Sequence, residues 1–292
     1  MLRTLSSIVC AAFSIGVVAQ GKLTDSIVTV QDSVEVRRWE IGAEVLSRYL
    51  WRGQSWGGNY PAFQPYVNFA ITPALTAGVW ATTNFNTQYY ELDGITPKGY
   101  QEFDFGLSYQ LNPFLSFEVW DYYWPSFQQE EGVNRGYFNY GPDGVKTVDA
   151  SIIADFSEGY QFAFNFTIST LIAGNDYRYD TNGENPRQNY TTYIEAGYTF
   201  SEIFKRHPSR ILQHISIHPV IGMVLNNQAG YYTYADYDRP SLVNLAISVS
   251  RAFECNDAFG MQVSADYTHN ASRDNTELFG RNFVTAKISV FY

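Results

Sequence analysis

The sequence predicts an all-β fold: a transmembrane, antiparallel, up-and-down β-barrel of about 12 strands. Apolar and polar residues alternate along most of the chain from Trp39 onward, which is the period of a strand with one apolar and one polar face. The segments between these runs are alternately short and long. Aromatic residues make up 17% of the chain and charged residues only 16%, against about 25% charged residues in soluble domains.

The chain begins with a segment that resembles a secretory signal peptide. Residues 1–19 contain Arg3, then an apolar run, then Val17 and Ala19 at the −3 and −1 positions of a cleavage site. We therefore expect a signal peptide at 1–19, a periplasmic lead-in at 20–38 and an outer-membrane barrel at 39–292. Of the two cysteines, Cys10 falls in the signal, so Cys255 has no partner for an internal disulfide.

Twelve segments of about ten residues have the period-two pattern, and this length crosses a bilayer at a tilt. They are residues 39–46, 63–71, 75–82, 102–109, 115–120, 148–156, 161–168, 193–200, 215–225, 243–250, 259–267 and 282–292. In the last segment, Val284, Ile288 and Tyr292 lie on the apolar face, and the chain stops there without a tail. An even strand count returns both ends of the barrel to one side.

The connections predict which ends of the strands face the periplasm. Short periplasmic turns are expected at 72–74, 112–113, 157–159 and 254–258, and long outer loops at 86–99, 125–145, 172–189, 226–240 and 270–281. Two connections depart from this rule. The outer connection 52–60 is short, and the periplasmic connection 201–213 is long and basic, with room for a helical turn.

Aromatic residues gather near the predicted strand ends, which favours two belts at the level of the lipid headgroups. They are Trp39, Tyr49, Trp51, Tyr60, Tyr89, Tyr90, Tyr122, Tyr123, Trp124, Tyr190, Tyr231, Tyr232 and Tyr292.

Residues 47–85 contain the pattern S-x-Y-x-x-R-G, then P-A-x-Q, then A-G-V-W. The matching residues are Ser47, Tyr49, Arg52, Gly53, Pro61, Ala62, Gln64, Ala77, Gly78, Val79 and Trp80. This segment of about forty residues is similar to the TorF-type family of bacterial outer-membrane porins, and the rest of the chain matches only in strand rhythm. The resemblance implies a barrel and a porin, and it brings no catalytic residues with it.

The polar faces of the strands should line the lumen. The charged residues expected there are Glu40, Glu44, Arg48, Glu102, Asp104, Glu118, Asp149, Asp155, Glu195, Asp266 and Lys287. Acids outnumber bases, so a water-filled lumen should favour cations. Alternatively, Glu44, Arg48 and Lys287 form a buried ion network that plugs the barrel. Because the first and last strands are neighbours in a closed barrel, Lys287 could pair with Glu40 or Glu44.

Enzyme chemistry has little support in the sequence. A barrel hydrolase would need a histidine near the outer rim, and only His269 fits, with Asp266, Ser272 and Asp274 nearby in sequence. We therefore predict no catalytic, cofactor-binding or metal-ligating residues, no cofactor and no enzyme activity. A formal net charge of −10 argues against a nucleic-acid partner.

The sequence thus predicts a porin-like channel in the outer membrane of a Gram-negative bacterium, which passes small hydrophilic solutes or cations passively. The expected partners are outer-membrane lipid, the solutes themselves and the barrel-assembly machinery, which would bind the C-terminal strand. A structural or adhesive barrel without transport is one alternative, and a hydrolase acting on outer-membrane lipid is another.

Overall fold

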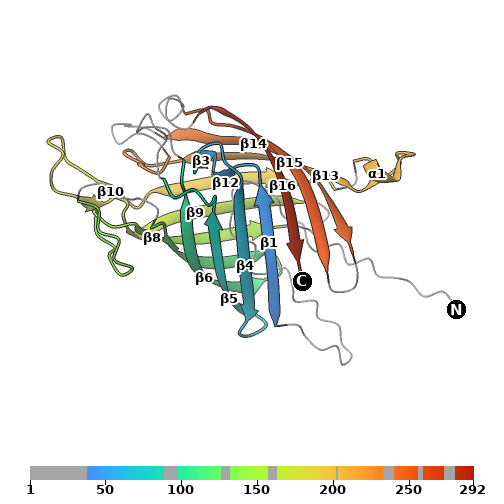
Figure 1. Cartoon of the computed structure of the whole chain (residues 1–292), viewed down its shortest axis with the longest axis horizontal. Coiled ribbons are helices and arrows are strands. Elements are labelled where there is room, and N and C mark those ends of the chain that lie inside the picture. Colours follow the sequence, from blue (N-terminus) through green and yellow to red (C-terminus); the bar gives the residue numbers. More distant parts are fainter. Residues whose placement is uncertain are drawn as a thin grey trace.

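The computed structural model describes residues 38–88, 98–125, 132–156, 163–201, 203–232, 240–255, 259–272 and 280–292. The expected signal peptide and nearly all of the lead-in lie outside these residues. The described chain forms a closed barrel of twelve strands, with the outer loops at one end and the tight turns at the other (Figure 1).

The barrel strands are β1 (Trp39–Leu46), β4 (Ala62–Ala70), β5 (Leu75–Thr83), β6 (Gln101–Asn112), β7 (Leu115–Tyr123), β8 (Lys146–Asp155), β9 (Phe164–Gly174), β12 (Thr192–Tyr198), β13 (Ile215–Val224), β14 (Ser241–Glu254), β15 (Gly260–His269) and β16 (Asn282–Phe291). Neighbouring strands pair antiparallel in chain order. The ring closes where β16 pairs with β1, with Val45 opposite Ile288. The predicted fold class is therefore confirmed.

All twelve predicted strands are present, and their bounds differ from the prediction by a few residues. β9 and β14 extend further toward the outer end than expected, to Gly174 and from Ser241. β-Bulges interrupt the alternation at Val148/Asp149 and Gly222/Met223, and period-two counting does not detect an extra residue of this kind. The helical turn expected in 201–213 is confirmed as α1 (Arg210–Gln213).

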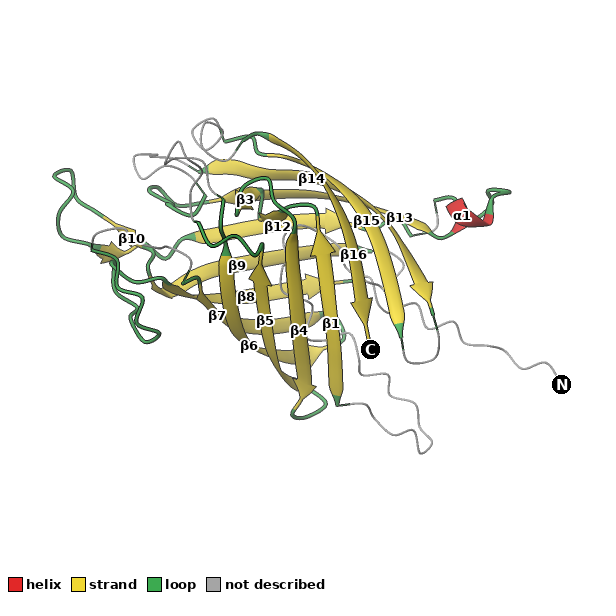
Figure 2. Ribbon diagram, in the orientation of Figure 1, coloured by secondary structure: helices red, strands yellow, loops and turns green. Residues whose placement is uncertain are grey.

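Figure 2 shows a barrel wall made of strands, with loops at its ends and α1 beyond one end. No helix in the described ranges is long and apolar enough to cross a membrane.

The two faces of the barrel wall differ in chemistry. Large apolar side chains are exposed on the outward positions of the strands, among them Phe103, Phe105, Leu107, Tyr109, Phe117, Val119, Ile152, Ile168, Ile221, Ile247, Val249, Val263, Tyr267, Val284 and Ile288. The inward positions hold buried polar, charged and aromatic side chains. An exposed apolar surface that runs around a barrel needs lipid to cover it.

Two inward-facing glycines make room for wide aromatic rings. A Cβ at Gly42 would lie 2.3 Å from the ring of Tyr66, and a Cβ at Gly106 would lie 2.5 Å from the ring of Trp120. Each ring therefore lies flat over a neighbouring strand and occupies space inside the barrel.

The connection between β1 and β4 is more than the short outer loop that we expected at 52–60. It contains a separate two-stranded hairpin, β2 (Tyr49–Trp51) and β3 (Gln54–Trp56), which is nearly all buried. The hairpin folds into the barrel, because its residues find their partners on the inner wall.

Candidate functional site

The in-folded hairpin turns at Arg52 and Gly53. Trp51 pairs with Gln54 across this two-residue loop. Both loop residues have positive φ, 47° for Arg52 and 81° for Gly53, which is the type I′ turn that matches the twist of two strands. The turn residues form the tip of the hairpin and lie deep in the interior.

The tip touches the barrel wall at β14, three strands from β1 around the ring. A Cβ at Gly53 would lie 2.1 Å from the carbonyl oxygen of Val243 on β14. The amide of Asn270 donates a hydrogen bond to the Gly53 carbonyl at 3.2 Å. The hairpin thus crosses the interior instead of lying along the rim.

Arg52 anchors the tip through a buried ion pair. Its Nη2 lies 2.7 Å from Oδ2 of Asp149 on β8, and the two side chains are 5% and 1% exposed. The guanidinium also donates to the Tyr232 hydroxyl at 2.6 Å and to the Ser169 hydroxyl. β8 and β9, which supply Asp149 and Ser169, lie opposite β1 in the closed ring. The pair therefore ties one side of the barrel to the other.

The Asp149 carboxylate is satisfied by neutral donors as well. Ser169 Oγ lies 2.6 Å from Oδ1, and the Tyr122 hydroxyl donates to Oδ2 at 3.1 Å. A buried carboxylate is tolerated when its remaining lone pairs are hydrogen-bonded in this way.

Aromatic rings pack around the hairpin. Trp51 stacks on Tyr232 with ring centroids 5.2 Å apart, and Tyr232 stacks on Tyr193 at 5.5 Å. The Arg52 guanidinium lies 4.7 Å from the Trp51 ring and 4.9 Å from the Tyr193 ring. The hairpin is therefore held in the outer part of the interior by stacked rings and by one cation that two of them share.

This packing corrects the prediction of headgroup belts for several aromatic residues. Tyr49, Trp51, Tyr122, Trp124 and Tyr232 are buried inside the barrel, and Tyr231 is partly buried and packs against them. Tyr122 is at an inward position near the end of β7, and the others lie in connections, where the alternation of the wall strands does not set the side-chain direction. Trp39, Tyr190 and Tyr292 are exposed, Tyr60 and Tyr123 are partly buried, and Tyr89 and Tyr90 lie outside the described residues.

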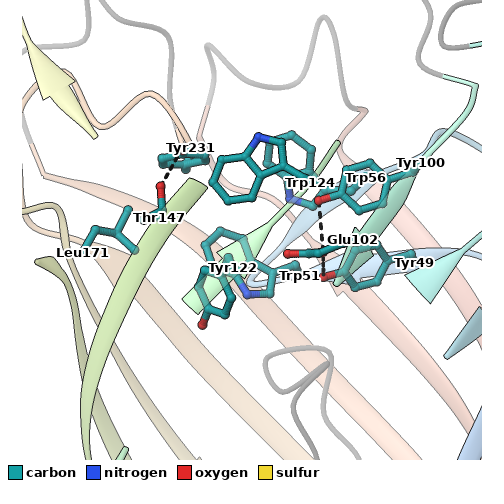
Figure 3. Close-up of a pocket in the computed structure, with 10 residues that line it drawn as sticks. All are labelled: Tyr49, Trp51, Trp56, Tyr100, Glu102, Tyr122, Trp124, Thr147, Leu171 and Tyr231. Carbon is teal, nitrogen blue, oxygen red and sulfur yellow. Dashed lines mark hydrogen bonds between the residues drawn. The ribbon is translucent and has the colours of Figure 1, made fainter. Parts of the chain in front are cut away.

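A small pocket lies beside the hairpin (Figure 3). Its lining is Tyr49, Trp51, Trp56, Tyr100, Glu102, Tyr122, Trp124, Thr147, Leu171 and Tyr231. Glu102 lies between Tyr49 and Tyr100 in Figure 3, and Oε2 accepts hydrogen bonds from their hydroxyls at 3.1 and 3.0 Å. The pocket is thus an aromatic chamber with one carboxylate in its wall.

The charged residues expected in the lumen occupy two kinds of position. Seven are buried: Glu102, Asp104, Glu118, Asp149, Asp155, Glu195 and Lys287. The other four are partly buried: Glu40, Glu44, Arg48 and Asp266. Arg52, which the charge pattern did not single out, makes the central ion pair; the only sequence signal for it was the R-G pair in the S-x-Y-x-x-R-G pattern.

The seam between β1 and β16 holds a second ion pair. Lys287 Nζ lies 3.2 Å from Glu44 Oε1, and Ser289 donates to the same oxygen at 2.7 Å. This is one of the two pairings expected for Lys287. Arg48 lies beyond the end of β1, where it hydrogen-bonds Asn59 and lies 5.1 Å from the Phe283 ring. The three residues therefore do not form the single network that we considered as a plug.

Other interior carboxylates are held by neutral donors. Glu195 accepts from the Tyr193 hydroxyl and, at 3.0 Å, from the Asn244 amide. Asp104 accepts from the backbone N–H of Tyr123 at 3.3 Å. These donors stabilise the carboxylates without cancelling their negative charge.

The geometry around His269 does not assemble a catalytic group. His269 Nδ1 lies 2.8 Å from Asn282 Oδ1. Asp266 stands three residues earlier on β15, so its side chain points to the opposite face of the strand. Ser272 is buried, and Asp274 lies outside the described residues. Across the described ranges, no group of three or more His, Cys, Asp or Glu side chains could hold a metal ion.

Three solved structures resemble this chain in fold. The NanC porin is 8% identical, with 86% of this chain and 98% of that chain covered and a TM-score of 0.45. LpxR from Salmonella typhimurium is 7% identical, with 87% and 99% covered and a TM-score of 0.45. An outer membrane channel from Pseudomonas putida F1 is 11% identical, with 91% and 99% covered and a TM-score of 0.46.

No protein-family model and no curated protein matches the chain, so the resemblance to the TorF-type family has no independent support. At these identities and TM-scores, the three likenesses carry no argument about activity. What the chain itself establishes is a closed twelve-stranded barrel, with an apolar exterior and an aromatic hairpin pinned inside it by Arg52 and Asp149.

Proposed function

We propose that this protein is an outer-membrane channel for the passive diffusion of small hydrophilic solutes or ions. The observation that carries the proposal is the contrast between the two faces of the closed wall, apolar outside and polar and acidic inside. A wall of this kind separates lipid from a polar interior, which is the arrangement of a membrane channel.

The in-folded hairpin sets the width of the channel. It crosses the interior from β1 to Asp149 and Val243, so a solute has to pass between the hairpin and the wall. Twelve strands enclose less space than the 16 to 18 strands of open porins. We therefore expect a narrow channel that excludes large solutes.

The charge of the interior favours cations over anions. Nine of the charged residues expected in the lumen are acids. Among them, Asp149 is in an ion pair with Arg52 and Glu44 with Lys287. Glu102, Asp104 and Glu195 are held by hydroxyl, backbone or amide groups instead. Fixed negative charge along a narrow path concentrates cations and repels anions.

The location follows from the same features. An exported barrel with an apolar exterior belongs in the outer membrane of a Gram-negative bacterium, where lipid contacts its outward side chains. The segment 1–19 would direct export, and β16 would be the strand read by the barrel-assembly machinery.

Planar bilayers test the channel directly. The full chain without residues 1–19, purified and refolded in detergent, should insert and give discrete current steps. Under a potassium chloride gradient, the reversal potential should have the sign of a cation-selective pore. A heat-denatured sample should give no steps. Anion preference would refute the cation proposal, and silent bilayers that contain folded protein would refute the channel.

A structural barrel without transport is the second candidate, because the hairpin and its stacked rings occupy the outer part of the interior. Conductance separates the two candidates. If folded wild-type protein gives no current steps, the barrel is structural.

A further inference from the structure

We propose that the aromatic pocket beside the hairpin binds a small quaternary ammonium cation, such as choline. The inference rests on the proposed function and deepens it, since it names a class of solute. It is carried by the pocket lining: aromatic rings on most sides and the carboxylate of Glu102 in the wall.

The rings form one continuous curved wall. Tyr49 contacts Tyr100 with ring centroids 5.5 Å apart, and Tyr100 contacts Trp56 at 5.9 Å. Trp56 contacts Tyr231 at 6.5 Å, and Tyr231 contacts Trp124 at 5.4 Å. Figure 3 shows these rings arranged around one space, with Glu102 among them. An enclosing set of ring faces is the arrangement that binds quaternary ammonium groups.

Glu102 supplies the negative charge that such a ligand needs. Its side chain is buried, and its hydrogen bonds come from the neutral hydroxyls of Tyr49 and Tyr100. The ion pairs found among the described residues do not include Glu102. A buried carboxylate without a counter-charge is costly, and a bound cation would lower that cost.

Other ligand classes fit this chamber less well. A sugar needs several free hydrogen-bonding groups, but the hydroxyls of Tyr49 and Tyr100 are engaged by Glu102, and that of Thr147 lies 3.0 Å from the Tyr231 hydroxyl. A primary ammonium needs three acceptors, and a metal ion needs several oxygens. A quaternary ammonium group has no N–H to satisfy and interacts with ring faces alone.

The same chemistry already occurs twice in this protein. The guanidinium of Arg52 lies between the rings of Trp51 and Tyr193. The ammonium of Lys146 lies 3.3 Å from the centroid of Tyr137 and 4.9 Å from that of Tyr140, and it pairs with Asp121. In both places, aromatic faces and one carboxylate hold a cation together, as the pocket would hold its ligand.

Isothermal titration of the folded barrel tests the inference. The protein is kept in a non-ionic detergent without choline headgroups and titrated with choline chloride. In parallel it is titrated with 3,3-dimethyl-1-butanol, which has the same shape but no charge. Choline should bind, and the neutral compound should bind at least about tenfold more weakly, because it lacks the interaction with Glu102 and the ring faces. Equal affinities, or no binding of choline, would overturn the inference.

Three variants locate the site. Glu102→Gln should weaken choline binding about tenfold, because the counter-charge is lost while the shape is kept. Trp56→Leu should also weaken it, by about fivefold, through the loss of a ring face. The control is Glu184→Gln, which removes the same charge from an exposed loop and should leave the affinity unchanged. If Glu102→Gln does not fold, Trp56→Leu tests whether the pocket is the choline site. An unaltered choline affinity in this variant contradicts the site.

Conductance measurements on the same samples separate this inference from the channel proposal. Cation-selective current without choline binding would leave the channel standing and refute the pocket. Choline binding without current would support the pocket and refute the channel.

Discussion

Replacing Arg52 by methionine should release the hairpin and destabilise the barrel. Methionine keeps much of the side-chain length but cannot pair with Asp149, whose Oδ2 now lies 2.7 Å from the guanidinium. Without Arg52, Asp149 is a buried charge whose donors are hydroxyls, those of Ser169, Tyr122 and Ser151. Removing one partner of a buried ion pair costs about 3–5 kcal/mol.

The cost should fall toward the lower end of that range, about 3 kcal/mol, because hydroxyl groups still donate hydrogen bonds to the carboxylate. Asp149→Asn alone should also destabilise the barrel, since it leaves the Arg52 guanidinium buried and uncompensated. The double variant Arg52→Met/Asp149→Asn should lose less stability than the sum of the two single losses, by at least about 1 kcal/mol, because neither charge then remains.

Urea unfolding in non-ionic detergent, followed by tryptophan fluorescence, measures these free energies. Arg178→Met is the matched control, because Arg178 is exposed on β10 (Tyr177–Arg178) and should shift the free energy by less than about 0.5 kcal/mol. Single-channel conductance provides a second measurement, and it should rise in Arg52→Met as the hairpin leaves the path. Additive losses in the double variant, or a conductance equal to that of the wild type, would contradict the anchoring role of Arg52.

Three further predictions concern the tip, the wall and the seam. Gly53→Ala should raise the single-channel conductance and lower the free energy of unfolding by about 1–3 kcal/mol, because the new Cβ would lie 2.1 Å from the Val243 carbonyl oxygen. Gly106→Ala should lower the unfolding free energy by a similar 1–3 kcal/mol or so, because its Cβ would lie 2.5 Å from the Trp120 ring. Lys287→Met should make the reversal potential more cation-selective, because it removes the positive partner of Glu44 from the interior.

Each of these predictions has a matched control. Gly183→Ala carries the same positive-φ penalty as Gly53→Ala but meets no atom within 4 Å, so an equal effect of the two changes would rule out the Val243 contact as the cause. Gly230→Ala, whose new Cβ would also lie in open space, is the matched control for Gly106→Ala. Arg178→Met removes a positive charge outside the barrel, and a reversal potential that moves as far as in Lys287→Met would contradict an interior effect.

Much of the fold could be predicted from the sequence because strand formation and strand faces are local properties. Alternation every second residue located all twelve strands, and the tight turns located one end of the barrel. The contact between Lys287 and Glu44 was also predictable, although the two residues are 243 positions apart in the chain. Closure of the ring makes the first and last strands adjacent.

The hairpin and the pocket depended on tertiary structure. Residues 49–56 have no strand register with the wall, so the sequence does not say whether they lie outside or fold in. Their direction is decided by partners far away in the chain: Asp149 and Ser169 for Arg52, Val243 and Asn270 for Gly53. A period in the sequence reports the face of a residue within its own strand. Only the closed ring brings opposite walls close enough for a connecting segment to bridge them.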